Sequence, residues 1–276
     1  MDPHKREAVT TADDAQSGFS AVVADYDRSA TASPVVAWMR QRIRGLVETQ
    51  VARGGSILEI NAGSGLDAAY FASRGYKVHA TDVAPGMLGA LAEKAHQPGV
   101  EGRLTYAALS FEDLRKVEGG PYDLAFSNLG GLNCSDDLQA VAEQLPSVLK
   151  PGGAIVWVIM PPLCPWELAQ ALRGHLRTAR RRFNRNGTLA NVGGAQVRTW
   201  YHAPGKVAKA LGPDCRVVGL RSFCLFAPPS YFGGFVRRHA KIAGMLMRLD
   251  DLLGGLWPFN RCGDFYALVA RYQPPG

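Results

Sequence analysis

Four residues in the first third of the chain could together bind a nucleotide-like cofactor. The stretch 58-LEINAGSGLD-67 places Glu59 in a short apolar run, with Gly63 and Gly65 directly after it. Glycines in such a turn let the backbone approach a ligand closely, because a side chain there would collide with it. Asp82 ends the next apolar run, seventeen residues after Gly65. A carboxylate at that place can accept hydrogen bonds from both ribose hydroxyls and disfavours a 2′-phosphate.

The turn departs from the dinucleotide-binding fingerprint. That fingerprint has a third glycine three residues after the second, where this chain has Ala68. Val83 and Met87, which follow Asp82, could instead offer an apolar surface to an adenine ring. The pattern favours a turn that binds an adenosine-containing cofactor, and it leaves open a strand-to-helix turn without a ligand.

Alternating strands and helices are expected to bring these residues to one edge of a sheet. Short apolar runs alternate with helical patterns up to residue 160, and the runs are apolar on both faces. This alternation predicts an α/β fold with a Rossmann-like, doubly wound, mostly parallel sheet of seven strands. The strands expected in this part are 56–60, 76–82, 103–109, 122–128 and 154–160, and the helices are 33–47 (N-cap Ser33, then Pro34), 66–75, 85–95 and 135–149.

The alternation of short strands and helices stops after residue 160, where longer connections begin. Elaborations at 162–213 and 228–262 should both leave the carboxyl end of the sheet, where such folds bind ligands. The elements expected here are strands within 195–201, 215–227 and 264–272, and a helix over 166–183 with Trp166, Leu172, Leu176, Ala179 and Phe183 on one face.

The charge is distributed unevenly. The net charge is +7, yet residues 168–249 contain fifteen Lys or Arg and a single acid, Asp214. Such an asymmetry indicates an anionic partner for the second half of the chain. The run Arg177–Arg185 is either a solvated helix face or a dock for an acyl carrier protein, a phosphate-bearing substrate or an anionic membrane surface.

Other features of the sequence narrow the class of protein. The five cysteines include no CxxC pair, so neither a disulfide framework nor a metal site is expected, and a reducing cytoplasm fits best. No apolar run is long enough for a transmembrane segment. Residues 1–18 are polar and read as a disordered lead-in rather than a secretory signal. We therefore expect a cytoplasmic protein.

Four segments, ILEINAGSGLD, VHATDVAPGML, YDLAFSNLGGLN and LKPGGAIVWV, together resemble the class I S-adenosylmethionine (SAM)-dependent methyltransferases. The resemblance covers about residues 19–160, and FSAVVADYDRSATASPVVAWMRQRI resembles the first helix of the small-molecule branch. It implies SAM as cofactor and S-adenosylhomocysteine as product. It also implies a SAM-binding core at 19–161, completed by strands within 214–227 and 263–273, with acceptor-binding lids at 162–213 and 228–262.

The resemblance assigns roles to individual residues. Glu59 would lie under the methionine amino group, and Asp67 would cap the following helix or contact the amino-acid end. Asn128 would face the sulfonium, and Tyr26 could close over the cofactor. The adenine amino group would be held near Ser110, with Glu112 as the alternative. The complete expected cofactor-binding set is Tyr26, Glu59, Asn61, Ala62, Gly63, Gly65, Asp67, Asp82, Val83, Met87, Ser110, Phe111, Asn128 and Leu129.

The acceptor is less well defined by the sequence. Methyl transfer from a sulfonium needs mainly positioning, and a general base only where the nucleophile carries a proton of high pKa. The loop after the fourth strand reads SNLGGLNC rather than the N/D-P-P-Y/F/W of enzymes that methylate base nitrogens, so a nucleic-acid partner is not favoured. The candidate bases are His175 and His202, and the candidate acceptor-binding residues are Asn133, Trp166, Glu167, Trp200 and Tyr201, with helix capping as the alternative for Glu167.

The sequence thus predicts a SAM-dependent methyltransferase acting on a small or lipid-like acceptor, free or carrier-bound. Methylation of oxygen in secondary metabolism is favoured. Two alternatives stay open, an RNA methyltransferase that uses the basic second half and a non-catalytic SAM-binding partner protein. The amphipathic segment 233–259 is expected to be a lid wall whose apolar face covers the acceptor, in preference to a helix on a membrane surface.

Overall fold

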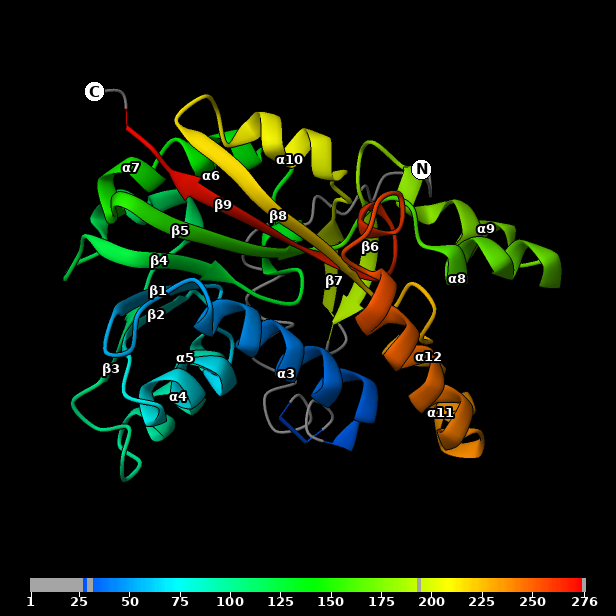
Figure 1. The fold of residues 1–276 in the computed structure, drawn as a ribbon, viewed down its shortest axis with the longest axis horizontal. Helices are drawn as coiled ribbons and strands as arrows, with labels where there is room; N and C mark the ends of the chain where they lie inside the picture. The colour runs from blue at the N-terminus through cyan, green and yellow to red at the C-terminus, as the bar shows by residue number, and fades with distance from the viewer. Residues whose placement is uncertain (1–26, 29–31, 193–194, 275–276) are drawn as a thin grey trace, which may run out of the picture.

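In a computed structural model of the chain, which describes residues 27–28, 32–192 and 195–274, seven of the eight expected strands form one sheet, and the strand expected within 195–201 lies outside it. Its order is β3-β2-β1-β4-β5-β9-β8, and β9 alone runs antiparallel to its neighbours (Figure 1). This confirms the predicted Rossmann-like, mostly parallel sheet. The strands are β1 (Ser56–Ile60), β2 (Lys77–Asp82), β3 (Leu104–Ala108), β4 (Tyr122–Ser127), β5 (Leu149–Ile159), β8 (Cys215–Phe223) and β9 (Phe265–Tyr272).

Helices cover both faces of the sheet, and the two hydrophobic cores follow from the alternation of side chains along each strand. In β5, Val156 and Val158 face one core, whereas Ile155 and Trp157 face the other. Figure 1 shows the first core's helices below the sheet and the second core's helices above it. They are α3 (Pro34–Glu48), α4 (Leu66–Ser73) and α5 (Pro85–Ala95) below, and α6 (Leu138–Ala142), α7 (Leu145–Val148) and α10 (Pro204–Ala210) above.

The helix ends in the first part lie where the sequence places them. The Ser33 hydroxyl accepts a hydrogen bond from the Val36 N–H, and Pro34 opens α3. Helix α4 follows Gly65 and ends before Gly75, and both glycines have positive φ. The positions of α3 and α4 therefore follow from capping chemistry that the sequence displays.

Two predicted helices are interrupted in the structure. The helix expected over 135–149 is divided into α6 and α7, because Pro146 has no N–H to donate and would clash with the preceding turn. The helix expected over 166–183 breaks at Gly174, which has a φ of +82°. Its pieces are α8 (Pro165–Leu168), a 3-10 turn (Ala169–Arg173) and α9 (Leu176–Arg180). The predicted common apolar face does not form, since Leu172 is 92% exposed.

The two long connections both begin at the carboxyl edge of the parallel strands. Ile159 pairs with Tyr266, and Phe223 pairs with Phe265, so β5 and β8 end where β9 begins. Helices α8, α9, α11 (Gly233–Arg238) and α12 (Ala240–Leu253) extend beyond this edge at the right of Figure 1. The first connection also holds a hairpin of β6 (Thr188–Val192) and β7 (Ala195–Thr199), of which the sequence indicated only the second strand.

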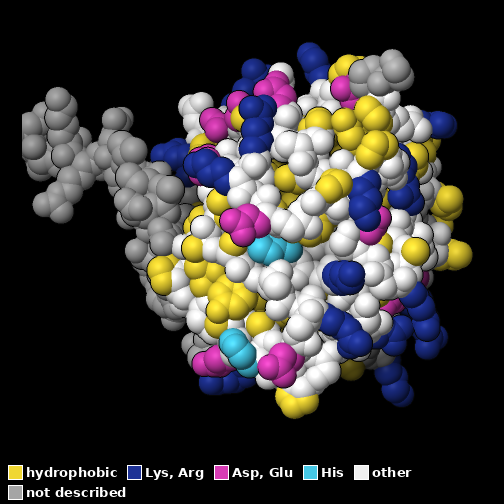
Figure 2. Space-filling model, turned by 90° about the vertical axis from the view of Figure 1, so that its left-hand side faces the viewer, with side chains coloured by type: hydrophobic (Ala, Val, Ile, Leu, Met, Phe, Trp, Pro, Cys, Tyr) yellow, Lys and Arg dark blue, Asp and Glu magenta, His cyan; other side chains and the backbone are white. Residues whose placement is uncertain are grey.

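The other end of the sheet faces the viewer in Figure 2. In the described part of this face, Lys and Arg side chains are mixed with acidic and hydrophobic side chains. The long connections, which have an excess of basic residues, leave the sheet at the opposite, carboxyl end. None of the described helices has the length and apolar character needed to cross a membrane.

Helix α12 has an exposed apolar stripe. Ile242, Met245 and Leu252 are 45%, 62% and 72% exposed, and their spacing places them on one stripe of the helix. The buried residues of the helix are Ala243 and Asp250, and Met247 packs against the first core. The role of this segment as a lid wall stays a prediction.

A buried guanidinium joins both long connections to the sheet. Arg182, directly after α9, donates to Glu167 at 2.6 Å and to Asp264, which precedes β9. It also donates to the Pro161 carbonyl at 3.2 Å, just after β5. The hydroxyl of Tyr231, from the second connection, donates to Glu167 at 3.1 Å. One cluster therefore holds the start of each long connection and the start of the last strand.

We predict that Arg182→Met lowers the free energy of unfolding by about 3–5 kcal/mol, because Asp264 would stay buried without its cation and Glu167 would keep only Arg181. Urea denaturation followed by circular dichroism measures the change. Arg185→Met is the control, since Arg185 is exposed. Equal unfolding midpoints for the two variants would show that the cluster does not stabilise the fold.

Candidate cofactor and acceptor site

The turn between β1 and α4 is fixed to the end of β2. Asn61, Gly63 and Gly65 have φ values of +56°, +58° and +80°, in the left-handed region that glycine adopts without strain. The Ala62 N–H donates to the Thr81 carbonyl at 2.9 Å, and the Gly65 N–H donates to the Ala62 carbonyl at 3.1 Å. The backbone of the turn is therefore held in one conformation by its neighbours.

The two glycines of the turn have different roles. A Cβ added to Gly65 would lie 2.2 Å from Leu91 Cδ1 in α5, so this glycine is needed for the packing of α5. Among the described residues, a Cβ added to Gly63 would have only Met87 Sδ within 4 Å, at 3.9 Å. Gly65 thus has a packing role in addition to the expected one, and the close approach of a ligand to both glycines stays a prediction.

Asp82 is oriented by three backbone N–H groups. One carboxylate oxygen accepts from Gly63 at 2.8 Å, and the other accepts from Val83 at 2.8 Å and Ala84 at 2.9 Å. Burial raises the pKa of Asp82, and these hydrogen bonds oppose the increase. A carboxylate has about four acceptor positions, so the oxygen bound to Gly63 can still accept from a ligand hydroxyl.

Two buried acceptor atoms beside the turn have no partner among the described residues. They are Oε2 of Glu59 and Oδ1 of Asn61. Burial raises the pKa of Glu59 well above its ordinary value, and the charge of Asp67 raises it further. Buried polar atoms in proteins normally have a hydrogen-bond partner. An ammonium group or a water could supply the missing donors, which fits the amino group of a SAM methionine end.

Asp67 has a role that the sequence did not predict. It does not cap α4, whose N-cap is Gly65. Its carboxylate is 2% exposed and accepts from Arg40 and from Arg44 Nε, the latter at 2.7 Å. Burial alone would raise the pKa of Asp67, but the two arginines outweigh burial and lower it. Asp67 therefore holds α3 against the start of α4.

Asn128, at the end of β4, belongs to the same cluster. Its Nδ2 donates to Asp67 at 2.7 Å, and its Oδ1 accepts from the Leu129 N–H at 2.8 Å. One amide hydrogen remains for another acceptor. The placement of Asn128 opposite the sulfonium stays a prediction, but its side chain is oriented by Asp67.

The other expected cofactor residues lie along the same edge. Val83 is 39% exposed, whereas Met87 is 2% exposed and packs below the turn. The Ser110 hydroxyl accepts from the Glu112 N–H and caps the turn that contains Phe111. Tyr26 lies outside the described residues.

Asp27 is a contact of the turn that the sequence did not single out. It accepts a hydrogen bond from the Ser64 hydroxyl, and Lys94 of α5 donates to it at 2.6 Å. Ser64 is fully buried within the glycine turn. The YD pair in the segment that resembles the first helix of small-molecule methyltransferases was the available signal. The chain before α3 thus reaches the glycine turn.

Two expected acceptor-binding residues are used inside the protein instead. Asn133 donates from Nδ2 to the Met160 and Trp200 carbonyls and accepts from the Met160 N–H, so its amide is fully engaged. Glu167 does not cap a helix, because the carboxylate binds Arg181 and Arg182. Burial would raise the pKa of Glu167, but its hydrogen bonds to these arginines lower it.

Two of the aromatic candidates for acceptor binding lie near the cluster formed by Arg182, Glu167 and Asp264. The Tyr201 ring faces the Arg182 guanidinium at 4.9 Å, and Trp166 packs against Phe232 at 5.4 Å between ring centres. Trp166 therefore joins the two long connections. Cys164 lies beside Glu167 and Asp264 in an arrangement that could hold a metal ion, but the guanidinium of Arg182 contacts both carboxylates there.

The two candidate bases differ in their surroundings. His175 is exposed just before α9. His202 is 1% exposed, and its Nε2 lies 2.8 Å from the Ser135 carbonyl. A carbonyl only accepts, so Nε2 carries the proton and Nδ1, which has no partner among the described residues, keeps a lone pair. Burial lowers the pKa of His202 and keeps the ring neutral at pH 7.

Residues 57–153 match a family model described as "Methyltransferase domain". This segment contains β1, the glycine turn, Asp82 and Asn128. Residues 57–153 therefore carry a methyltransferase domain, and the fold is shared with solved SAM-dependent methyltransferases, one of which has S-adenosylhomocysteine bound. No curated protein matches the sequence.

Solved structures share the fold at low sequence identity. The methyltransferase CcbJ from Streptomyces caelestis is 16% identical, with a TM-score of 0.62 over 94% of this chain and 99% of that chain. A 1,6-didemethyltoxoflavin-N1-methyltransferase from Burkholderia thailandensis, with S-adenosylhomocysteine bound, is 17% identical, with a TM-score of 0.56 over 95% of this chain and 89% of that chain. A putative methyltransferase in complex with the Haloferax volcanii activator Trm112 is 15% identical, with a TM-score of 0.54 over 93% of this chain and 98% of that chain. The likeness thus extends beyond the matched domain to nearly the whole fold.

We predict that Gly65→Ala lowers the free energy of unfolding by roughly 1–3 kcal/mol, because the added Cβ overpacks against Leu91. In a Leu91→Ala background the same substitution should cost less, since the clashing atoms are gone. Chemical denaturation of the four proteins in this cycle measures the coupling. An equal cost in both backgrounds would contradict the packing role of Gly65.

Proposed function

We propose that this chain transfers the methyl group of SAM to a small or lipid-like acceptor, with oxygen as the favoured atom and secondary metabolism as the setting. The observation that carries the proposal is the position of the two long connections. Both leave the sheet at the edge where the glycine turn, Asp82 and Asn128 lie, so they can form walls around an acceptor. In the Burkholderia thailandensis relative, the bound acceptor is a small molecule, 1,6-didemethyltoxoflavin.

The expected cofactor residues at the carboxyl edge of the sheet have different roles. Asp82 is oriented to accept from a ribose hydroxyl, and Glu59 offers a buried acceptor atom for the amino group. Within the described part of the chain, only Met87 Sδ lies within 4 Å of the place that a Cβ at Gly63 would take. When bound, SAM supplies an activated methyl group, so the protein contributes positioning and the exclusion of water.

A hydroxyl acceptor must lose a proton as its oxygen is methylated. His202 is the candidate proton acceptor, because its neutral ring holds an unprotonated Nδ1 at the junction between β5 and the first connection. The His202 N–H donates to the Met160 carbonyl at 3.2 Å, and Tyr266 donates to the His202 carbonyl at 3.0 Å. These contacts fix the backbone of His202 beside the end of β5, and the hydrogen bond from Nε2 to the Ser135 carbonyl orients the ring. His175 has no comparable support among the described residues.

Asp82→Ala should weaken the binding of S-adenosylhomocysteine by about 1–3 kcal/mol, through the loss of a charge-assisted hydrogen bond to the ribose. Isothermal titration calorimetry measures this, with NADH titrated in parallel. Asp113→Ala is a matched control, since Asp113 pairs only with exposed Lys116 among the described residues. Unchanged affinity in Asp82→Ala would refute the ribose contact, and binding of NADH alone would refute the cofactor.

The acceptor atom can be identified with SAM labelled by carbon-13 in its methyl group. The protein is incubated with this cofactor and a small-molecule extract, and the chemical shift of the transferred methyl carbon distinguishes oxygen from nitrogen and carbon. We expect label on oxygen in a small molecule. Label recovered in RNA would favour the RNA methyltransferase instead, and cofactor binding without any transfer would favour the non-catalytic partner protein.

A further inference from the structure

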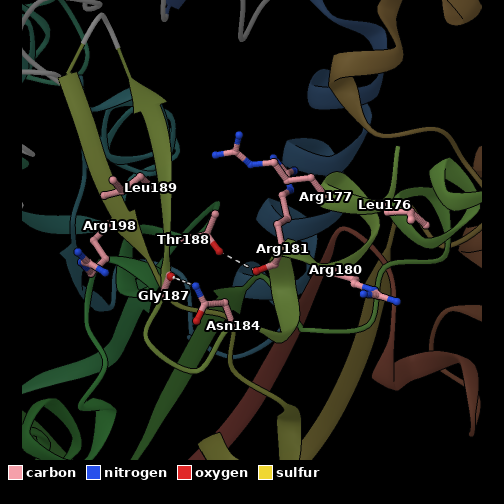
Figure 3. A pocket seen from close by; sticks show the side chains of 9 residues that line it. All are labelled: Leu176, Arg177, Arg180, Arg181, Asn184, Gly187, Thr188, Leu189 and Arg198. Carbon is pink, nitrogen blue, oxygen red and sulfur yellow. Dashed lines mark hydrogen bonds between the residues drawn. The ribbon is translucent and has the colours of Figure 1, made fainter. Parts of the chain in front are cut away.

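A cationic cavity of about 580 Å³ lies between α9 and the β6–β7 hairpin (Figure 3). Arg177, Arg180, Arg181 and Arg198 contribute to its lining, and none of the described lining residues is acidic. Leu176 and Leu189 add apolar surface. The cavity is therefore built to receive a ligand that has an anionic part and an apolar part.

Three of the four arginines have no acidic partner in the part of the chain that the structure describes. Arg181 is neutralised by Glu167 at 2.6 Å, and Glu167 does not line the cavity. Arg177, Arg180 and Arg198 form no ion pair among the described residues, and Arg198 donates only to the Asn186 carbonyl, at 2.9 Å. Like charges around one cavity repel each other, and a multiply charged anion would relieve this repulsion.

The walls of the cavity are tied to each other. Thr188 Oγ1 donates to the Arg181 carbonyl at 2.6 Å, and Asn184 Nδ2 donates to the Gly187 carbonyl at 2.7 Å. Both hydrogen bonds are visible in Figure 3, where the Arg177 side chain extends from α9 toward the hairpin. The cavity thus has a defined shape without a ligand, which reduces the entropic cost of binding.

The β6–β7 hairpin, which forms one wall of the cavity, is connected to the carboxyl edge of the sheet, where the expected cofactor residues lie. A Cβ at Gly187 would lie 3.0 Å from the Trp200 indole, so the hairpin packs directly on this ring. The Trp200 N–H donates to the Asn133 carbonyl at 2.8 Å, and Asn133 lies five residues after Asn128. The cavity wall and the end of β4 therefore belong to one connected structure.

We propose that this cavity binds a phosphate group carried by a small-molecule acceptor. A phosphate monoester carries close to two negative charges at pH 7, which matches several guanidinium groups better than a single carboxylate does. A phosphate group fills only part of the cavity, which leaves room for the apolar part of the acceptor beside Leu176 and Leu189. The assignment of the ligand as the acceptor rests on the proposed function, whereas the anion site does not.

The test is a titration with inorganic phosphate, followed by broadening of the phosphorus-31 resonance. It compares the wild-type protein with the double variant Arg177→Ala, Arg198→Ala. The control is Arg173→Ala, Arg185→Ala, which removes the same charge from two exposed residues outside the cavity. We expect the Kd for phosphate to rise at least about tenfold in the cavity variant and less than about twofold in the control.

Absence of phosphate binding by the wild-type protein, or an equal loss in both double variants, would overturn the proposal. Binding of RNA that depends on Arg177 and Arg198, without binding of phosphate, would assign the surface to a nucleic acid and also overturn it. S-adenosylhomocysteine titrated into the same samples should bind all of them equally. Its failure to bind would refute the proposed function while leaving the phosphate result intact.

Discussion

The position of everything beyond the carboxyl edge of the sheet depends on the guanidinium of Arg182. Burying a charge is costly unless it is paired and hydrogen-bonded, and Arg182 meets both conditions through Glu167, Asp264 and the Pro161 carbonyl. Arg181 balances the second carboxylate, so two cations face two anions and the cluster is close to neutral. Because its members come from distant parts of the chain, the cluster can form only when the sheet and both long connections are assembled.

The cofactor edge is organised by a second buried charge cluster. Asp67 pairs with Arg40 and Arg44, and Glu59 lies within the field of these three charges. Asn128 connects this cluster to β4. Helix α3, the glycine turn and the end of β4 are thus fixed relative to one another before any cofactor binds, and the protein has little to reorganise on binding.

The sequence was most informative where a structural requirement is local. The sheet, α3 to α5 and the turn followed from periodicity, capping residues and glycine spacing, all of which act within a few residues. Pro146 and Gly174 interrupt helices even though the apolar periodicity around each of them favours a continuous helix. The family-model match over residues 57–153 lies within residues 19–160, the part of the chain that the resemblance covers.

The roles of Asp67, Asn133 and Glu167 could not be read from the sequence in the same way. Each of these side chains is engaged by partners far along the chain, such as Trp200 for Asn133, which is 67 residues away. A polar residue near an expected site looks the same in a sequence whether it faces a ligand or joins two segments. Only the hydrogen-bond inventory of the fold separates these two cases.

The unequal roles of the two turn glycines have an evolutionary consequence. Gly65 is required by the packing of Leu91 whether or not a cofactor binds, whereas among the described residues only Met87 Sδ, at 3.9 Å, would lie within 4 Å of a Cβ at Gly63. A descendant of this chain that lost its cofactor would still retain Gly65 under selection for folding, while Gly63 would be free to drift within the limits of its backbone conformation. Among related sequences, loss of the first glycine with retention of the second would therefore mark a lineage that kept the fold and abandoned the ligand.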